Sequence, residues 1–429
     1  MPCPTRRLAF LLLLLALWPG SAVAGGFTIP DFGGRRVGMM ATVAYPDDVT
    51  AIFHNPAGLV LLDGTVFQFY GAAAFSDLGI RLYDSEGTLH PDHEISPDIS
   101  MGAIPFLGAS TDFGNERLRL AFGVYAPNAF GAALPEDEPT RYHATKVLFV
   151  GSRATLSAAW RFSPEFSIGA GVSLVHVFLM ANRFLNVSVL ANPDRRFLPP
   201  DQTAAGDGRL ELDGQGFSYA WDFGLLFEPS STLRIGASFA SGSSPVLTGD
   251  VVLKQPDGTT ERATQRTPMS IPFTLRAGVN WAFAPAFEVG VDVRYWHYQV
   301  YQELRSTLSN TIAGMDEFVD PKNYGNSWNW CTGLLYRIHP DVELMTGYQQ
   351  DFTPIPKQTF TLDNPSRDQR GITGGIRWRV ASNHRIGLYG LHNWLNTVDV
   401  QESISIPPSN TKGHGSTSEL GFEYIWQVL

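Results

Sequence analysis

The stretch that decides the fold is Tyr45-Pro-Asp-Asp-Val-Thr-Ala-Ile-Phe-His-Asn-Pro-Ala-Gly-Leu-Val-Leu-Leu62, because it is helical in character while the chain after it alternates. Pro46 suits the first position of a helix, and Asp47 and Asp48 favour the positive end of a helix dipole. Val49 is followed at helical spacing by Ile52 and Phe53, which predicts one apolar face.

A second helical turn is predicted immediately after the first. Pro56 disfavours helical geometry at Asn55, so the first helix should end there. Asn55 can cap the next turn, with Pro56 at its first position, Ala57 after it and Gly58 early in the turn. The stretch therefore predicts two short helices joined at a sharp corner, just ahead of a long β domain.

This region resembles the N-terminal hatch of FadL-like proteins, which are outer-membrane transporters for long-chain fatty acids and aromatic hydrocarbons. The resemblance is carried by Gly26-Phe-Thr-Ile-Pro30, by Gly33, Gly34 and Gly38, by Asp47-Asp48 and by Asn55-Pro-Ala-Gly-Leu59. It implies a hatch or gating role for Asp47, Asp48, Asn55, Pro56, Ala57 and Gly58.

The composition agrees with an exported membrane protein. Aromatic residues make up 12 % of the 429 residues, glycines number 42, and charged residues are only 17 %. Such proportions suit a β-barrel in lipid better than a soluble helical enzyme. The formal net charge of −10 makes nucleic acid a poor candidate partner.

Residues 1–24 are predicted to be a secretory signal peptide. Arg6 and Arg7 form its basic region, Leu8 to Trp18 its apolar core and Ala22-Val-Ala24 its cleavage site. Cys3 leaves with this segment, so Cys331 is the lone cysteine of the predicted mature chain and no internal disulfide is expected.

From Asp63 onward the apolar period is two, and we predict fourteen strands over residues 63–429. The sixth strand places Phe217, Tyr219, Trp221, Phe223, Leu225 and Phe227 on one face, opposite Ser218, Ala220, Asp222 and Gly224. A soluble β-sandwich would show the same alternation. Aromatic residues at strand ends favour an all-β, antiparallel transmembrane barrel instead.

The lengths of the connections support the barrel. Short turns are predicted at 111–115, 163–164, 229–231, 284–286, 339–341 and 382–383, and long connections near 76–98, 127–144, 186–207, 241–270, 302–322, 351–369 and 399–412. This alternation is typical of short periplasmic turns and long outer loops. An even strand count brings both termini to the periplasmic side of the outer membrane of a Gram-negative bacterium.

Fourteen strands enclose a lumen wider than side chains alone fill, so something must occupy it. We expect residues 25–62 to form a small helical plug there. Asp47 and Asp48 then either meet inward arginines such as Arg276 or Arg294, or stay solvated as a surface charge pair.

The third strand carries the second part of the resemblance, in Gly123-Val-Tyr-Ala-Pro127 and Arg141-Tyr-His-Ala-Thr-Lys146. It implies that cargo leaves sideways into the membrane near this strand. Pro127 cannot donate a ladder hydrogen bond, and Ala126, Asn128 and Gly131 surround it. Either a bulge forms here or the proline ends the strand where a loop begins.

The outer loops should set cargo preference, because loops tolerate change. Arg183, at the end of the predicted fifth strand, is a candidate contact for a cargo carboxylate. Arg195 and Arg196 are better explained as contacts to lipopolysaccharide phosphate. His90 and His93 are interpreted as loop polar residues.

No catalytic motif, metal-ligand spacing or cofactor motif is found in the sequence. We therefore expect a monomeric transporter, and not an enzyme, that takes up hydrophobic small molecules by passive diffusion. The open alternatives are a porin-like channel for small polar solutes, an outer-membrane lipid-modifying enzyme and an adhesin.

Overall fold

The computed structural model describes residues 26–29, 31–84, 87–89, 93–97, 101–186 and 207–428. The predicted signal peptide, Pro30, His90 and the loop residues Arg195 and Arg196 lie outside these ranges. Within the described ranges, no helix is long and apolar enough to cross a membrane.

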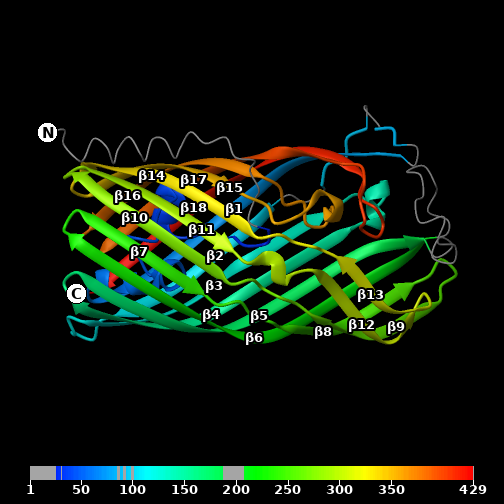
Figure 1. The fold of residues 1–429 in the computed structure, drawn as a ribbon, viewed down its shortest axis with the longest axis horizontal. Coiled ribbons are helices and arrows are strands. Elements are labelled where there is room, and N and C mark those ends of the chain that lie inside the picture. Colours follow the sequence, from blue (N-terminus) through cyan, green and yellow to red (C-terminus); the bar gives the residue numbers. More distant parts are fainter. Residues whose placement is uncertain are drawn as a thin grey trace.

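The described strands form one antiparallel sheet that closes on itself, because β1 pairs with both β2 and β18 (Figure 1). The strands are β1 Thr65–Leu82, β2 Met101–Thr111, β3 Leu118–Ala133, β4 Lys146–Ser163, β5 Phe166–Asn186, β6 Asp207–Ser230, β7 Leu233–Ala240, β8 Val246–Lys254, β9 Thr260–Pro268, β10 Thr274–Ala284, β11 Phe287–Trp296, β12 Glu303–Ile312, β13 Met315–Pro321, β14 Ser327–His339, β15 Val342–Asp351, β16 Gln369–Ala381, β17 His384–Val400 and β18 Thr411–Val428. Short 3-10 turns outside the plug are η2 Pro139–Tyr142, η5 Tyr298–Val300 and η6 Lys357–Thr359.

The eighteen described strands form fourteen barrel-spanning segments, as the sequence predicts. Four of these segments are interrupted by a bend, so each contains two strands: β7 with β8, β9 with β10, β11 with β12, and β13 with β14. The predicted long connections 241–270 and 302–322 are therefore wrong as loops. They contain the hairpins β8–β9 and β12–β13, which extend the wall beyond β7, β10, β11 and β14.

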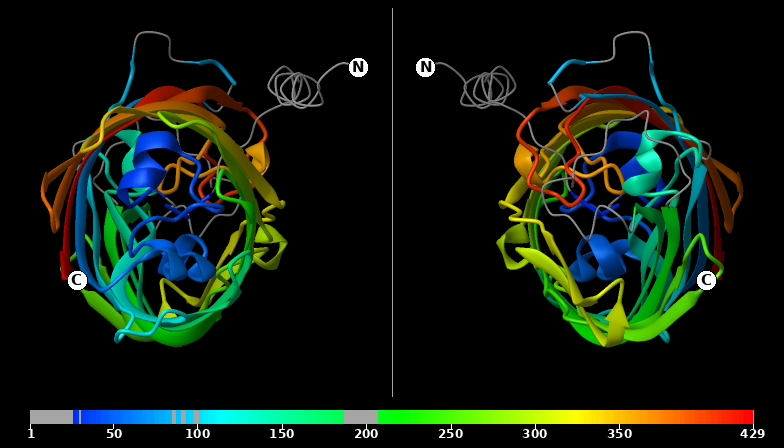
Figure 2. Two further views of the ribbon diagram at one scale, coloured as in Figure 1. Left: turned by 90° about the vertical axis from the view of Figure 1, so that its left-hand side faces the viewer. Right: turned by 90° about the vertical axis from the view of Figure 1, so that its right-hand side faces the viewer.

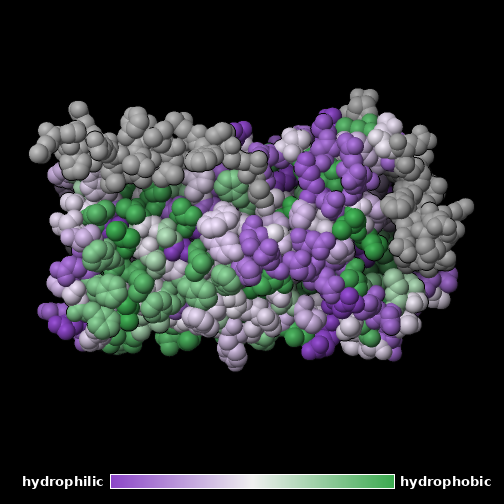
Figure 3. Space-filling model, viewed as in Figure 1, coloured by the Kyte–Doolittle hydropathy of each residue, from purple (hydrophilic) through white to green (hydrophobic). Residues whose placement is uncertain are grey.

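The strands alternate as predicted. Along β6, Phe217, Tyr219 and Trp221 are exposed on the outside of the barrel, while Ala220 and Asp222 are buried inside. Apolar side chains gather over the half of the surface at the short-turn end, and polar ones over the half at the long-loop end (Figure 3). The apolar half is the surface that lipid would cover.

Aromatic residues mark both edges of the apolar half. The rings of Phe287 and Tyr336 stack 4.6 Å apart near the short turns, and those of Tyr295 and Trp328 lie 4.7 Å apart farther along the same strands. Such rings suit the two interfaces between lipid and water.

Residues 31–62 lie inside the ring of strands (Figure 2). They form α2 Gly34–Met39, α3 Ala51–His54 and η1 Pro56–Leu61, and we call residues 31–62 the plug. Phe32, Met39, Ile52 and Leu59 pack with inward side chains of the wall into one buried apolar cluster. Burial of these side chains stabilises the plug in the lumen.

The corner at Asn55 forms as predicted. Its side-chain oxygen accepts from the Ala57 amide at 3.2 Å, which caps η1. The same side chain donates to the carbonyls of Val43 and Leu225, both at 2.9 Å, and so ties the corner to β6. Gly224 leaves the space that this requires, because a Cβ there would lie 2.1 Å from the Asn55 oxygen.

Two details of the plug differ from the prediction. Pro46 does not begin the first helix; α3 begins at Ala51, and the Asp48 carboxylate accepts from the Thr50 amide at 2.8 Å. The helix α2 was not predicted at all, since its apolar residues are separated by glycines and arginines whose burial depends on the barrel wall.

Candidate functional site

A cavity of about 1310 Å³ lies in the lumen between the plug and the outer loops. Its wall is mostly apolar and aromatic: Phe27, Leu82, Phe130, Val147, Phe149, Leu179, Leu210, Met269, Tyr301 and Phe318. This size and lining suit a hydrophobic small molecule. None of the predicted plug residues Asp47, Asp48, Asn55, Pro56, Ala57 or Gly58 is among the described residues that line it.

The outer end of the cavity is polar. Arg183 lines it, as a cargo contact would, and donates from Nη1 to the Ile406 carbonyl oxygen at 3.0 Å. Lys322 also lines it, with Nζ 2.6 Å from Asp320. The sequence pattern does not reveal Lys322, because residues 302–322 are typical of one loop, whereas in the structure Lys322 immediately follows β13.

Charge compensation differs between these two cations. Burial opposes the charge on Lys322, but the carboxylates of Asp320 and Asp363 outweigh burial and raise the pKa of the amine. Arg183 has no carboxylate within ion-pair distance among the described residues. His143 lines the same end, and burial followed by the charge of Arg183 lowers the pKa of its imidazole to about 4, so it is neutral at pH 7. Arg183 is thus a half-buried cation that feels the charges of Asp320 and Asp363 without forming an ion pair with either.

The floor of the cavity is a cluster of aromatic rings around Phe27. Its ring lies 5.3 Å from Phe149, 5.2 Å from Tyr298 and 5.7 Å from Tyr301, all edge-on. The Tyr298 hydroxyl accepts from the Phe27 amide at 3.2 Å. The start of the described chain thus closes the cavity on its periplasmic side.

The barrel wall is incomplete beside this floor. Pairing of β2 with β3 runs from Thr111 only as far as Phe106, opposite Tyr125. Beyond that point, residues 101–105 pair with β1 alone, and residues 128–133 pair with β4 alone among the named strands. We call this place the β2–β3 gap.

The predicted residues Ala126, Pro127, Asn128 and Gly131 lie at this gap. Strand β3 continues to Ala133, so Pro127 does not end it. The register with β4 shifts between Tyr125 and Asn128, which makes a bulge at Ala126 and Pro127. Of the two possibilities left open by the sequence, the bulge is the one that forms.

Residues 27–29 occupy the gap in place of β2, and we call them the N-terminal segment. The Ile29 amide donates to the Pro127 carbonyl at 2.8 Å, and the Ala129 amide donates to the Phe27 carbonyl at 3.1 Å. Thr28 lies opposite Asn128 as an antiparallel bridge, and the Asn128 amide donates to the Thr28 hydroxyl at 3.2 Å. Three residues therefore cover the free edge of β3 at the gap.

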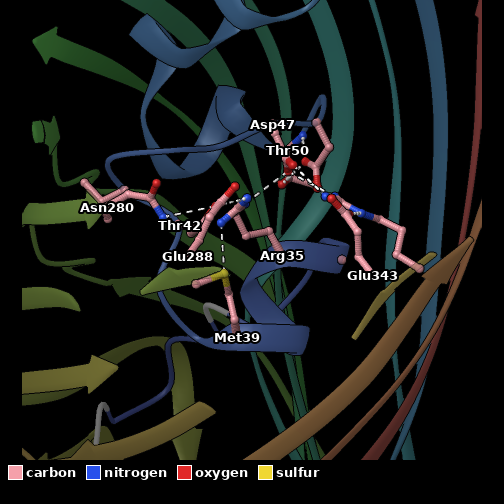
Figure 4. A network of polar contacts seen from close by, with 12 residues as sticks. Arg35, Met39, Thr42, Asp47, Thr50, Asn280, Glu288 and Glu343 are labelled. Atoms are coloured by element: carbon pink, nitrogen blue, oxygen red, sulfur yellow. Dashed lines mark hydrogen bonds and ion pairs between the residues drawn. The ribbon is translucent and has the colours of Figure 1, made fainter. Parts of the chain in front are cut away.

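A buried ion network ties the plug to strands β11, β15 and β16 of the barrel wall (Figure 4). Asp47 lies 3.3 Å from Arg35 of α2 and 2.7 Å from Arg377 of β16. Arg35 also reaches Glu288 of β11 at 3.0 Å, and Arg377 reaches Glu343 of β15 at 2.6 Å. The network joins three strands to the plug through charges removed from water.

An inward arginine of the wall does meet Asp47, as predicted, but it is neither of the two arginines named as examples. Asp47 pairs with Arg35 and Arg377, and Asp48 bonds to Thr50. Arg276 lies over the Phe53 ring, and Arg294 pairs with Asp292 at 3.3 Å. Strand parity placed both arginines inside the barrel correctly but did not identify which plug residue each one meets.

The remaining sequence candidates have local contacts. Cys331 is buried, and its thiol donates to the Met40 carbonyl at 3.2 Å. His93 is exposed beside Glu138, at 2.7 Å. In the part of the chain that is described, no three His, Cys, Asp or Glu side chains gather as metal ligands.

Residues 15–414 match the family described as outer membrane protein transport protein (OMPP1/FadL/TodX). The chain belongs to this family. The FadL/TodX proteins include a long-chain fatty acid transport protein of Salmonella typhi, 20 % identical to this chain over 86 % of it and 87 % of the relative.

Solved structures share the fold of this FadL/TodX-family chain. A Pseudomonas aeruginosa FadL homologue aligns with a TM-score of 0.81 at 16 % identity, over 94 % of this chain and all of its own (100 %). The P. putida toluene transporter TodX aligns with a TM-score of 0.71 at 16 % identity, over 95 % and 99 % of the two chains. This FadL/TodX-family protein is an outer-membrane β-barrel, and the Salmonella typhi and P. putida relatives are named as transporters.

One prediction concerns the plug of this FadL/TodX-family barrel. Burial, followed by the nearby carboxylates of Glu423 and Asp47, raises the pKa of Asp48 to about 6 from its ordinary 3.8. Below pH 3.8 the carboxyl is protonated in both the folded and the unfolded protein, so the shift has no effect on the free energy of unfolding. As the pH rises from 3.8 to 6, the unfolded protein ionises first, and the free energy of unfolding falls. Asp48→Asn should therefore raise the free energy of unfolding by about 2 kcal/mol at pH 7.5, with little effect at pH 3.5.

Urea unfolding of the purified protein in detergent at the two pH values measures this difference. A variant that is less stable than the parent at pH 7.5 would show that the ionised carboxylate stabilises the plug.

Proposed function

We propose that the protein takes up hydrophobic small molecules, long-chain fatty acids or aromatic hydrocarbons, by passive diffusion as a monomer. Cargo is captured by the outer loops, enters the cavity and leaves sideways through the β2–β3 gap into the membrane. Lipid and lipopolysaccharide are its other contacts. This proposal extends to this chain what the names of its relatives state of them.

The observation that carries the proposal is the position of the N-terminal segment. The apolar cavity ends at Phe27, and the same segment fills the gap in the wall through two main-chain hydrogen bonds. Below it, the lumen is filled by the buried plug. The shortest apolar route out of the cavity therefore runs past residues 27–29 and through the wall.

The energies favour a sideways exit. Five hydrogen bonds hold residues 27–29, two to the main chain of β3 and three that involve Tyr298 or the Thr28 and Asn128 side chains. At about 1 kcal/mol for each bond and about 2–3 kcal/mol for the burial of Phe27, displacing the segment costs about 7–8 kcal/mol, which is within the range of local opening in a folded protein. A hydrophobic cargo gains about 0.8 kcal/mol for each methylene group that leaves water. That gain is retained when cargo passes from cavity to lipid, whereas a route into the periplasm would lose it.

Arg183 should hold the head group of acidic cargo. Arg183→Gln is expected to weaken binding of dodecanoate about tenfold, since a hydrogen bond to a charged group is worth about 1.5–3 kcal/mol. Binding of dodecan-1-ol should change less than twofold. Arg370→Gln, an exposed arginine of β16 that does not line the cavity, is the matched control.

Uptake of labelled dodecanoate and toluene by cells that lack other such transporters tests the proposal itself. Expression of the protein should raise uptake of at least one of the two probes several-fold. Equal uptake with and without the protein would overturn the proposed function. If Arg183→Gln weakens the binding of dodecanoate and of dodecan-1-ol equally, Arg183 does not hold the head group, but the proposed transport is unaffected.

A further inference from the structure

A second group of charges lies deeper in the lumen, between the cavity and the plug. It consists of Arg153 of β4, Asp222 of β6 and Arg276 of β10, which are 5 %, 2 % and 5 % exposed. Arg153 pairs in register with Tyr125, the last residue of β3 before the bulge. On β4 it is two inward positions beyond Phe149, whose ring borders the cavity.

The level of this group relative to the gap follows from the register. Between Phe149 and Arg153 on the inner face is Gly151, which pairs with Asn128 at the gap. Four residues along a strand span about 13 Å. Arg153 therefore lies just to the periplasmic side of the β2–β3 gap. Asp222 is 3.7 Å from its Nη1 atom, and Arg276 interacts electrostatically with both.

The group carries one positive charge in excess. Asp222 is 3.7 Å from the Arg153 Nη1 atom, which is an ion pair without a hydrogen bond. Arg276 lies 4.5 Å over the Phe53 ring. Among the described residues it has no ion pair and no hydrogen bond. The adjacent pairs Arg294 with Asp292 and Arg36 with Asp31 are already balanced.

The unpartnered atoms point to a ligand. Nε and Nη1 of Arg153 and both carboxylate oxygens of Asp222 are buried without a hydrogen-bond partner. Burying an uncompensated charge is unfavourable by several kcal/mol, and a cation–π contact returns about 2 kcal/mol at most. A guanidinium fork matches the two oxygens of a carboxylate.

Neighbouring hydroxyls extend the polar surface. The Tyr125 hydroxyl lies 2.8 Å from the Thr155 hydroxyl, which lies 2.8 Å from that of Ser173. These groups stand on β3, β4 and β5, on the same side of the lumen as the gap. They can bond to an anion that the arginines attract.

We propose that Arg153 and Arg276 form a deep subsite for the carboxylate of an amphiphilic cargo. The head group rests there while the hydrophobic tail lies at the level of Phe27 and the gap. Displacement of Phe27 both uncovers the subsite and opens the wall. This inference rests on the proposed transport function and adds an inner position to the one at Arg183.

Binding to the full mature chain in detergent, in an Arg183→Gln background, tests the subsite with dodecanoate, dodecan-1-ol and inorganic phosphate. Arg276→Gln should weaken dodecanoate binding at least fivefold and leave dodecan-1-ol unchanged. Asp222→Asn should strengthen dodecanoate binding at least threefold, because the net charge rises from one to two. Arg370→Gln serves as the control and should change neither.

Other outcomes overturn the subsite. The subsite is excluded if Arg276→Gln weakens the binding of dodecanoate and of dodecan-1-ol equally. It is also excluded if Asp222→Asn binds dodecanoate more weakly, or if inorganic phosphate at equal concentration displaces dodecanoate. If Arg276→Gln does not fold, Asp222→Asn carries the test alone. A parent protein that takes up neither dodecanoate nor toluene fails the proposed function. A protein that takes up either probe, but binds dodecanoate and dodecan-1-ol equally in the Arg183→Gln background, fails only the subsite.

Discussion

A disulfide that fixes the N-terminal segment to β3 is expected to reduce uptake of hydrophobic cargo more than tenfold. Thr28 and Asn128 are the natural positions, because they face each other between the Ile29–Pro127 and Ala129–Phe27 hydrogen bonds. Such non-hydrogen-bonded antiparallel pairs bring Cα atoms to about 4.5 Å, within the range of a disulfide. The variant Thr28→Cys with Asn128→Cys should fold as the parent does.

The disulfide variant allows two internal controls. Adding a reductant should restore uptake to the level of the two single-cysteine variants, since the thiols leave the segment free. Cys331→Ser removes the buried native thiol, which lies against Met40 and far from the gap in sequence. Full uptake by the quantitatively oxidised protein would mean that cargo does not leave past residues 27–29.

Loss of Arg377 is expected to release the plug. Arg377→Met leaves Asp47 and Glu343 buried without their common cation, and breaking a buried pair in this way destabilises by about 3–5 kcal/mol. The barrel itself should persist, since its strands pair independently of the plug. We expect frequent openings in planar bilayers, where the parent protein conducts little.

The control for this experiment lies two residues away on the same strand. Arg379 is 57 % exposed and 3.9 Å from Asp341, so Arg379→Gln should change stability by less than about 1 kcal/mol and leave conductance unchanged. A closed Arg377→Met channel would show that apolar packing alone retains the plug. Large steady conductance of the parent would instead favour a porin for polar solutes.

Local patterns in the sequence predicted much of the fold. The alternation along residues 217–227 predicts the same outward and inward faces that the structure shows. This works because successive side chains of a β-strand point to opposite faces, so the pattern has a period of two. The Asn55-Pro56 corner was predictable for a similar reason: capping and the geometry before proline are set within three residues. The hairpins β8–β9 and β12–β13 were missed because polar side chains cover the outside of the barrel there.

Contacts between distant segments were not predictable. Asp47 and Arg377 are 330 residues apart, and parity shows only that an arginine points inward. The pairing of Thr28 with Asn128 could not be predicted either, because no sequence pattern in one segment identifies the other as its partner. The sequence marked Arg183 as a candidate carboxylate contact at a strand end, and the structure adds that it lines the cavity, whereas Lys322 has no sequence signal of its own.

The central claim is that cargo leaves through the β2–β3 gap. Dodecanoate with a terminal photoreactive diazirine, crosslinked to the protein in lipid nanodiscs and mapped by mass spectrometry, tests it most directly. In the reduced Thr28→Cys, Asn128→Cys variant, we predict labels at the cavity residues Phe130 and Phe149 and at Pro105 and Ala126 beside the gap. In the oxidised form, labels should remain at the cavity alone, and labelling of the plug residues Leu59 and Leu62 in either form would contradict the account.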